Sequence, residues 1–128
     1  MVRIFLLMIL CHIIDDFVLQ PICLSNLKQK EYWDKTFKND KHALFLYEKD
    51  YIAALIVHGV SWAIMIHLPL IFMTDVSGIA IGFSVLINAA IHAIIDNIKA
   101  NKKSINLVMD QFAHFVQICI VFTYLGAI

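Results

Sequence analysis

Residues 76–98 read VSGIAIGFSVLINAAIHAIIDNI and carry one formally charged side chain, Asp96. A transmembrane α-helix needs about 20 predominantly apolar residues, because each residue advances the helix by about 1.5 Å. Three further apolar runs are long enough to cross a bilayer, at 2–24, 51–73 and 105–128. All four runs are too long for the strands of a membrane barrel. The sequence therefore predicts an all-α integral membrane protein that folds as a four-helix bundle.

The overall composition supports this fold class. Hydrophobic residues make up 61% of the 128 residues, charged residues make up 16%, and the mean hydropathy is +0.79. A chain of this length corresponds to one domain, so we expect a single membrane domain over 1–128 with the lipid bilayer as its partner. Ten basic and ten acidic residues balance to a net charge of zero. This balance predicts no nucleic-acid partner.

The basic residues indicate how the chain is oriented. Six lysines lie in 25–50 and three in 99–103, whereas Arg3 alone lies at the opposite end. Because Lys and Arg concentrate on the cytoplasmic side, we expect a protein of the cytoplasmic (inner) membrane with both termini outside. The first run contains His12, Asp15 and Asp16, which a secretory signal would not carry. We therefore expect 2–24 to be a retained helix.

The long connection 25–50 has two interpretations. Its six lysines and five acidic residues favour a solvated cytoplasmic segment. Tyr32, Trp33, Phe37 and the apolar run 43–47 favour instead a helix that lies in the membrane interface. In the third run, Gly78 and Gly82 have the spacing of close helix contacts in lipid, which leaves a homo-oligomer open.

Ionisable residues inside the apolar runs carry the functional information. An Asp at the centre of a membrane helix costs about 2.5–3.5 kcal/mol on insertion scales, so such residues are rarely left without partners. The chain has eight Asp and His residues of this kind: His12, Asp15, Asp16, His58, His92, Asp96, Asp110 and His114. Their number predicts a polar site within the bundle.

Spacing and direction place most of these residues at one depth. Three runs contain His and Asp four residues apart, which puts both on one helical face: His12 and Asp16, His92 and Asp96, and Asp110 and His114. Only the last pair has Asp first, and only its helix runs outward, so every Asp lies nearer the cytoplasm. At about 1.5 Å per residue the groups cluster within about 5–17 Å of the cytoplasmic ends. Asp15 flanks His12 on the other side from Asp16, so either carboxylate can face the centre, whereas His67 lies opposite His58 and is expected outside the site with a backbone partner.

These segments resemble a known family. HIIDDFVLQ (12–20), the lone His58, HAIIDNIK (92–99) and DQFAH (110–114) look like the domain of unknown function 3307 family, small multi-pass membrane proteins of bacteria and their phages. The resemblance covers nearly the whole chain but implies no established activity. Asp15 departs from the family pattern. The resemblance implies a functional set of His12, Asp16, Gln20, His58, His92, Asp96, Lys99, Asp110, Gln111 and His114.

The chemistry of this set favours a metal centre. Imidazoles and carboxylates together suit divalent Zn, with Mn, Fe or Co as alternatives. Four ionised Asp residues carry a charge of −4, which two divalent ions would balance, so we expect one or two ions. The metal ligands are predicted to be His12, Asp16, His58, His92, Asp96, Asp110 and His114. A proton or cation pathway, a haem-binding bundle and purely structural polar packing remain as alternatives.

A metal centre in this position suggests a hydrolase. A bound divalent ion activates water, and a looser fold-level similarity links the family to predicted membrane-bound metal-dependent hydrolases. The sequence has no Ser or Cys catalytic triad and no phosphate-binding glycine loop, so covalent and nucleotide-dependent chemistry lack support. The catalytic residues are left open. We expect Lys99, Gln20 and Gln111 to contact the substrate, and Lys99 to hold a lipid phosphate at the cytoplasmic mouth.

Overall fold

The computed structural model describes residues 1–126, and every regular element in that range is helical. Pro21, Gln29 and Asn106 mark breaks at which extended backbone separates successive helices. The elements in chain order are α1 (Val2–Ile13), η1 (Ile14–Leu19), α2 (Ile22–Leu27), α3 (Lys30–Thr36), α4 (Lys41–Leu46), α5 (Asp50–Met73), α6 (Gly78–Asn97), η2 (Ile98–Lys102) and α7 (Leu107–Leu125). The two η segments are π-helical. The all-α prediction is confirmed.

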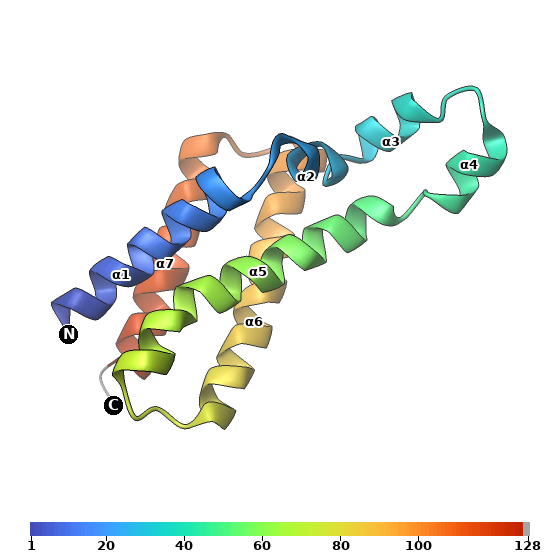
Figure 1. Cartoon of the computed structure of the whole chain (residues 1–128). Helices are drawn as coiled ribbons and strands as arrows, with labels where there is room; N and C mark the ends of the chain where they lie inside the picture. Colours follow the sequence, from blue (N-terminus) through green and yellow to red (C-terminus); the bar gives the residue numbers. More distant parts are fainter. Residues whose placement is uncertain (127–128) are drawn as a thin grey trace.

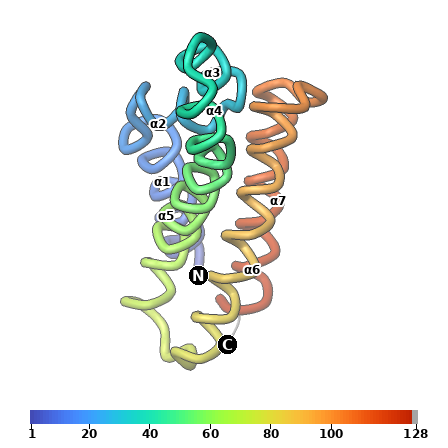
Figure 2. The backbone as a smooth tube through the Cα atoms, turned by 90° about the vertical axis from the view of Figure 1, so that its right-hand side faces the viewer, coloured from blue at the N-terminus to red at the C-terminus, as the bar shows by residue number. Residues whose placement is uncertain are grey.

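Four long helices form the body of the molecule. Helix α5 packs against α1 on one side and α6 on the other, and α7 contacts both α6 and α1 (Figure 1). Viewed from the side, α1 and α5 lie in one layer and α6 and α7 in the other (Figure 2). The turn between α5 and α6 lies at the same end as the C-terminus, whereas α2 and η2 lie at the opposite end (Figure 1).

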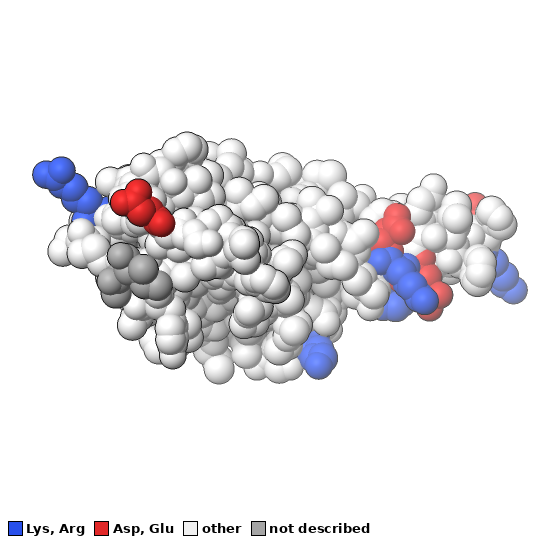
Figure 3. All heavy atoms as spheres, turned by 90° about the horizontal axis from the view of Figure 1, so that it is seen from below, with Lys and Arg blue, Asp and Glu red and all other residues white. Residues whose placement is uncertain are grey.

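Three helices are long and apolar enough to cross a membrane. They are α5, α6 with its continuation η2, and α7. The predicted runs 51–73, 76–98 and 105–128 correspond to them, although the last two residues of the third lie outside the described part of the chain. Large apolar side chains on these helices, such as Phe83 and Phe112, are exposed. Figure 3 shows a broad stretch of surface without charged side chains between the two ends of the molecule.

The first predicted span is shorter than expected. Helix α1 and η1 run together from Val2 to Leu19, and Gln20 then adopts an extended conformation instead of continuing to residue 24. The cause is Pro21, which lacks a backbone N–H and disfavours helical backbone at the preceding residue. Arg3, Asp15 and Asp16 also lower the hydropathy of this segment. It is therefore not among the three long apolar spans.

The connection after the first helix is itself helical. Helix α4 is capped by Asp40, whose carboxylate accepts hydrogen bonds from the backbone N–H groups of His42 and Ala43. The Trp33 ring stacks on Phe37 and Tyr47 with interplanar angles of 25° and 16°. Helices α3 and α4 extend away from the four-helix body (Figure 2).

Close packing of α5 on α6 depends on one glycine. A Cβ atom on Gly59 would lie 2.6 Å from the backbone oxygen of Ala89, so a side chain there would force the two helices apart. By contrast, a Cβ at Gly78 or Gly82 would meet no atom within 4 Å among the described residues. The close contact within the chain is thus made by Gly59, not by the glycine pair that the sequence pattern drew attention to.

The apolar core fills the half of the bundle nearest the termini. It is built from side chains of all four long helices: Ile4, Met8, Trp62, Ala63, Ile66, Leu70, Ala89, Ile118 and Val121. At the end away from the termini the core stops at Trp62, which is fully buried. Beyond Trp62, toward α2 and η2, the interior of the bundle becomes polar.

Candidate metal centre

The polar interior brings His and Asp side chains of four helical segments together. The Nε2 atom of His58 lies 3.3 Å from Asp16 and 3.6 Å from Asp96, which joins α5 to η1 and α6. The Nε2 atom of His114 lies 3.6 Å from Asp96 and 3.5 Å from Asp110 within α7. His58, His114 and Asp110 are each at most 2% exposed. The predicted convergence of the helices on one polar site is therefore present in the structure.

Two groups in this cluster have the geometry of metal ligands. One contains Asp16, His58 and His92, and the other contains His92, Asp96 and His114. Within each group one ligand atom from every residue lies within 4.8 Å of the others. The groups share His92, and a neutral imidazole has one lone pair to offer. The shared ligand makes them neighbouring parts of one centre.

The pattern of unsatisfied atoms fits a cation. Buried polar atoms in proteins nearly always have hydrogen-bond partners, and each exception needs an explanation. In residues 1–126 the buried side-chain atoms without a partner are Asp15 Oδ2, Asp16 Oδ1, His58 Nε2, both ring nitrogens of His92, Asp110 Oδ1 and His114 Nε2. All belong to the cluster. These nitrogen and carboxylate donors, concentrated at one point, are the donor set of a divalent metal such as Zn.

Aromatic rings fix the orientation of the imidazoles. His92 stacks on His114 with ring centroids 4.1 Å apart and on Trp62 at 4.3 Å, and the Trp62 and His114 rings are 5.3 Å apart. Trp62 is four residues after His58, so the two share a helical face. The indole thus closes the site toward the apolar core. The sequence analysis did not identify this residue, although its spacing from His58 was an available signal.

His12 lies beside the two ligand groups rather than within them. The indole N–H of Trp62 donates to His12 Nδ1 at 2.8 Å, and His12 Nε2 lies 3.1 Å from the side-chain oxygen of Gln111. Both ring nitrogens therefore have protein partners. The Gln111 amide nitrogen in turn donates to Asp16 and Asp110 at 3.1 and 3.2 Å. His12 is placed to orient carboxylates through Gln111, and a ligand role for it stays a prediction.

The π-helical segment η1 explains how two consecutive aspartates face the same site. A π-helix has i→i+5 hydrogen bonds and a wider turn than an α-helix, so successive side chains diverge less around the axis. Asp15 is 1% exposed and accepts a 2.7 Å hydrogen bond from Ser61, and its other oxygen lies 3.6 Å from His58 Nδ1. Asp16 lies on the other side of His58. Asp15, undecided from the sequence, is thus part of the cluster.

Two lysines lie at the open end of the site. Lys28, only 6% exposed, donates to Asp96 at 2.5 Å and to the Gln20 side chain at 3.2 Å. Lys99 donates to Asp110 at 2.6 Å. Lys99 and Gln20 were expected near the site, but Lys28 was not, because it lies in a connection with many lysines. Its position depends on the chain reversal at Pro21, which sequence spacing alone does not define.

The segment that carries Lys28 is tied to η2. The Asn101 side chain donates to the Lys28 backbone oxygen at 3.0 Å and accepts from the Lys30 backbone N–H at 2.7 Å. Glu31 pairs with Lys103 at 2.7 Å, and hydrogen bonds from Lys103 and Lys35 lower the pKa of the Glu31 carboxyl to about 2. These contacts hold the segment between α2 and α3, which carries Lys28, against η2.

His114 also contacts a chain of amide side chains. Its Nδ1 atom lies 3.4 Å from the side-chain oxygen of Gln117, whose amide nitrogen donates to Asn88 at 3.2 Å. Because an amide oxygen can only accept, this contact is a hydrogen bond in the tautomer with the proton on Nδ1. The Nε2 atom then presents a lone pair to Asp96 and Asp110, which is the form required of a metal ligand.

The polar chain continues as far as His67. The Asn88 amide donates to the Ser84 hydroxyl at 3.3 Å, and that hydroxyl lies 2.8 Å from His67 Nε2. His67 Nδ1 lies 2.7 Å from the backbone oxygen of Ala63, the backbone partner expected from the sequence. His67 is therefore linked to the site through three intervening side chains but does not face it.

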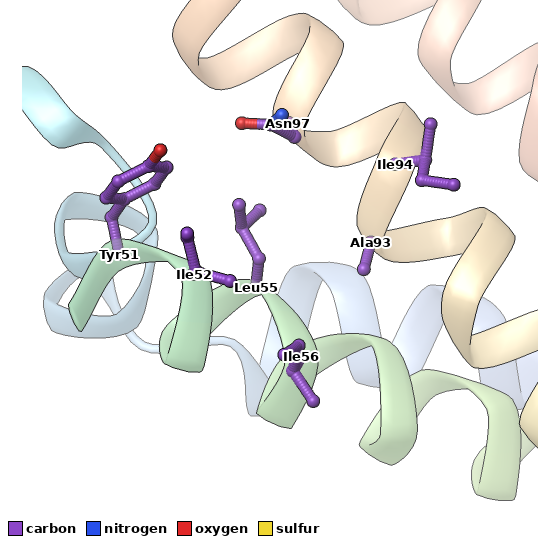
Figure 4. A pocket seen from close by; sticks show the side chains of 7 residues that line it. All are labelled: Tyr51, Ile52, Leu55, Ile56, Ala93, Ile94 and Asn97. Atoms are coloured by element: carbon purple, nitrogen blue, oxygen red, sulfur yellow. The ribbon is translucent and has the colours of Figure 1, made fainter. Parts of the chain in front are cut away.

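A separate groove lies on the outside of the bundle. It has a volume of about 230 Å³ between α5 and α6, and Tyr51 and Asn97 are its polar residues. Figure 4 shows the other labelled side chains, which are aliphatic, between the same two helices. None of the predicted ligands lines it. We therefore place the functional site at the buried cluster and not in this groove.

The fold and the cluster together define a class of protein. The chain is all-helical, has three helices able to cross a membrane, and contains buried His and Asp groups that could hold a metal ion. It belongs to the family described as protein of unknown function (DUF3307), whose model matches residues 4–127. The resemblance seen in the sequence is thereby confirmed. Comparison with curated proteins and with solved structures gave no significant match.

Proposed function

We propose that this protein is a metal-dependent hydrolase of the cytoplasmic membrane. Its substrate would be lipid-linked or otherwise close to the membrane, and it would reach the site from the cytoplasmic side. The observation that carries the proposal is the set of buried, unpartnered ligand atoms contributed by η1, α5, α6 and α7. Leaving such atoms without a partner in a bundle interior is costly, and a bound cation removes that cost.

The charges of the site favour a single ion when no substrate is present. Taken as ionised, Asp15, Asp16, Asp96 and Asp110 carry −4, and the Lys28 and Lys99 ammonium groups reduce this charge to −2. One divalent cation then balances the site. The mixture of imidazole and carboxylate ligands favours Zn, with Mn, Fe or Co as alternatives.

Hydrolysis is the reaction that this arrangement supports best. A bound divalent ion lowers the pKa of water and so provides a nucleophile near neutral pH. Asp110 lies outside both ligand groups, and its Oδ1 atom has no hydrogen-bond partner. Lys99 and Gln111 hold its other oxygen. We infer that Asp110 accepts the proton released from water.

The membrane arrangement is part of the proposal. We infer that the helix formed by α1 and η1 also lies in the bilayer, which would complete a four-helix membrane bundle with both termini outside. Its neighbours α5 and α7 support this placement, because it packs directly against both. The excess of lysines at the end with α2 and η2 supports a metal centre near the cytoplasmic face.

Metal content and hydrolysis test the proposal together. Protein purified in detergent should contain close to one equivalent of divalent metal by elemental analysis. It should also hydrolyse a generic chromogenic ester in a way that chelation abolishes and added metal restores. His92→Ala should lose both properties, because His92 belongs to both ligand groups. His42→Ala, which changes an exposed histidine, should retain both. Metal-free wild-type protein that cannot be loaded would refute the proposal.

A second candidate function is supported by the polar chain from His114 to His67. Hydrogen-bonded side chains inside a membrane bundle can carry protons, and this chain leads away from the cluster toward the opposite end. Beyond His67, toward the turn between α5 and α6, the buried residue Leu70 is apolar. Proton flux into liposomes that Asp16→Asn abolishes would favour conduction. Absence of flux in metal-loaded wild-type protein would favour hydrolysis.

A further inference from the structure

We propose that Lys28 and Lys99 form a binding site for a phosphoryl group directly over the metal centre, so that the substrate is a phosphate ester. This inference rests on the proposed function and specifies its substrate class. The resemblance to a family carries no such assignment, and Lys28 is not among the functional residues that the resemblance implies. The inference is carried by the pocket that joins the two lysines to the carboxylates of the cluster.

The pocket has both signs of charge on its walls. A cavity of about 180 Å³ is lined by two carboxylates, two ammonium groups and two amides: Asp16, Asp96, Lys28, Lys99, Gln20 and Gln111. A smaller adjoining cavity of about 110 Å³ shares Gln20, Lys28, Asp96 and Lys99. The carboxylates are those of the metal groups. A ligand in this pocket would therefore contact the lysines and the metal ligands at the same time.

Both lysines have donors left for an anion. An ammonium group has three N–H donors. Lys28 uses one on Asp96 and one on Gln20, and Lys99 uses one on Asp110. The burial of Lys28 strengthens its interaction with an anion, because water competes less there. A metal ion bound to Asp96 would weaken the hold of that carboxylate on Lys28 and turn the ammonium toward the pocket.

The charge balance selects a dianion and couples it to the metal. Two divalent ions and two ammonium groups carry +6, and the four carboxylates carry −4, which leaves +2. A phosphate monoester dianion would neutralise this excess. Without the anion, one ion already balances the site. Phosphate and metal should therefore each increase the binding of the other, as thermodynamic linkage requires.

Cobalt binding provides a test that does not depend on activity. Protein in detergent is titrated with Co²⁺, followed by its visible absorption, with and without inorganic phosphate. The expected result is that phosphate tightens Co²⁺ binding by about tenfold and raises the bound amount toward two equivalents.

A second comparison distinguishes the sources of the phosphate. The Co²⁺ titration is repeated in mixed micelles that contain phosphatidic acid and in micelles that contain phosphatidylcholine. Tightening by inorganic phosphate alone indicates a soluble phosphate ester, and tightening by phosphatidic acid indicates a lipid phosphate.

Variants of the lysines separate binding from folding. Lys28→Met should abolish the effect of phosphate without weakening Co²⁺ binding alone, because removal of an ammonium group next to Asp96 favours a cation. Lys28→Arg should retain the effect. Lys102→Met, an exposed lysine of η2 that does not line the pocket, is the matched control and should behave as wild type. Normal Co²⁺ binding that neither anion changes would overturn this inference alone. Absence of Co²⁺ binding would overturn the proposed function and this inference with it.

Discussion

At the level of single residues, the imidazole of His114 shows how neighbouring side chains orient a candidate ligand of the proposed metal centre. Gln117 accepts from its Nδ1 atom, and Asn88 in turn accepts from Gln117. The ring is stacked on His92. These contacts fix the orientation of the ring, and partners of this kind raise the affinity of a metal site.

Substitution of Gln117 should change metal affinity without removing a ligand. Gln117→Leu removes the acceptor for His114, so we expect metal affinity to fall by about 10–100-fold. Gln117→Glu keeps an acceptor at the same place and should therefore bind metal about 10–100-fold more tightly than Gln117→Leu does. Titration of both variants with Zn²⁺ in detergent checks this. Equal affinities for the Leu and Glu variants would contradict a positioning role.

Sequence spacing identified the residues of the cluster that share a helical face. His92 with Asp96 and Asp110 with His114 are four residues apart, and geometry within one helix is enough to pair them. Lys28 could not be found in this way. Its contact with Asp96 joins residues 68 positions apart and depends on a loop.

At the level of elements, the two π-helical segments shape the site. Segment η1 brings Asp15 and Asp16 to one cluster, and η2 carries Lys99 at its mouth. A rotation of about 100° per residue applies only to α-helices, so the sequence alone could not decide the role of Asp15. Local widening of helices at functional sites is a recurrent feature of proteins.

Helix packing at Gly59 should be sensitive to a single methyl group. Gly59→Ala places a Cβ 2.6 Å from the backbone oxygen of Ala89, so we expect a loss of about 1–3 kcal/mol of stability. Gly82→Ala, a substitution of the same kind in open space, should be neutral or slightly stabilising. Thermal unfolding in detergent measures both. A Gly59→Ala protein as stable as the Gly82→Ala protein would show that the helices do not meet this closely.

The contact between α3 and the end of η2 should weaken at acidic pH. The pKa of Glu31 is lowered from 4.5 to about 2 by Lys103 and Lys35, so its contribution is present above pH 4.5 and is lost as pH falls toward 2. An NMR titration of the Glu31 carboxyl should show this low midpoint. Lys103→Ala should move it upward. A wild-type midpoint near 4.5 would mean that the pair does not form in solution.

At the level of the whole molecule, the polar site and the apolar core divide the bundle along its length. The core lies toward the termini and the cluster lies toward α2 and η2, with Trp62 between them. The helices that are able to cross a membrane could be predicted from the apolar runs. To predict the division between apolar core and polar site, one would need the rotation of the four helices relative to one another, which the sequence does not define.

Labelling of cysteines tests the orientation. Cys23 is exposed on α2, so an impermeant maleimide should reach it only from the cytoplasmic side of membrane vesicles. In a Cys23→Ser background, Asp75→Cys in the turn between α5 and α6 should be labelled only from the opposite side. Labelling of both positions from the same side would contradict the arrangement and the cytoplasmic position of the metal centre.

The most direct test of the central claim is the melting temperature of the purified protein with and without divalent metal. An ion that binds only the folded protein stabilises it by about 2.7 kcal/mol at a concentration 100 times its Kd. Saturating Zn²⁺, Mn²⁺, Fe²⁺ or Co²⁺ should therefore raise the melting temperature of chelator-treated wild-type protein, and His114→Ala should reduce the increase. Equal melting temperatures of wild-type protein with and without each of the four metals would contradict the metal centre.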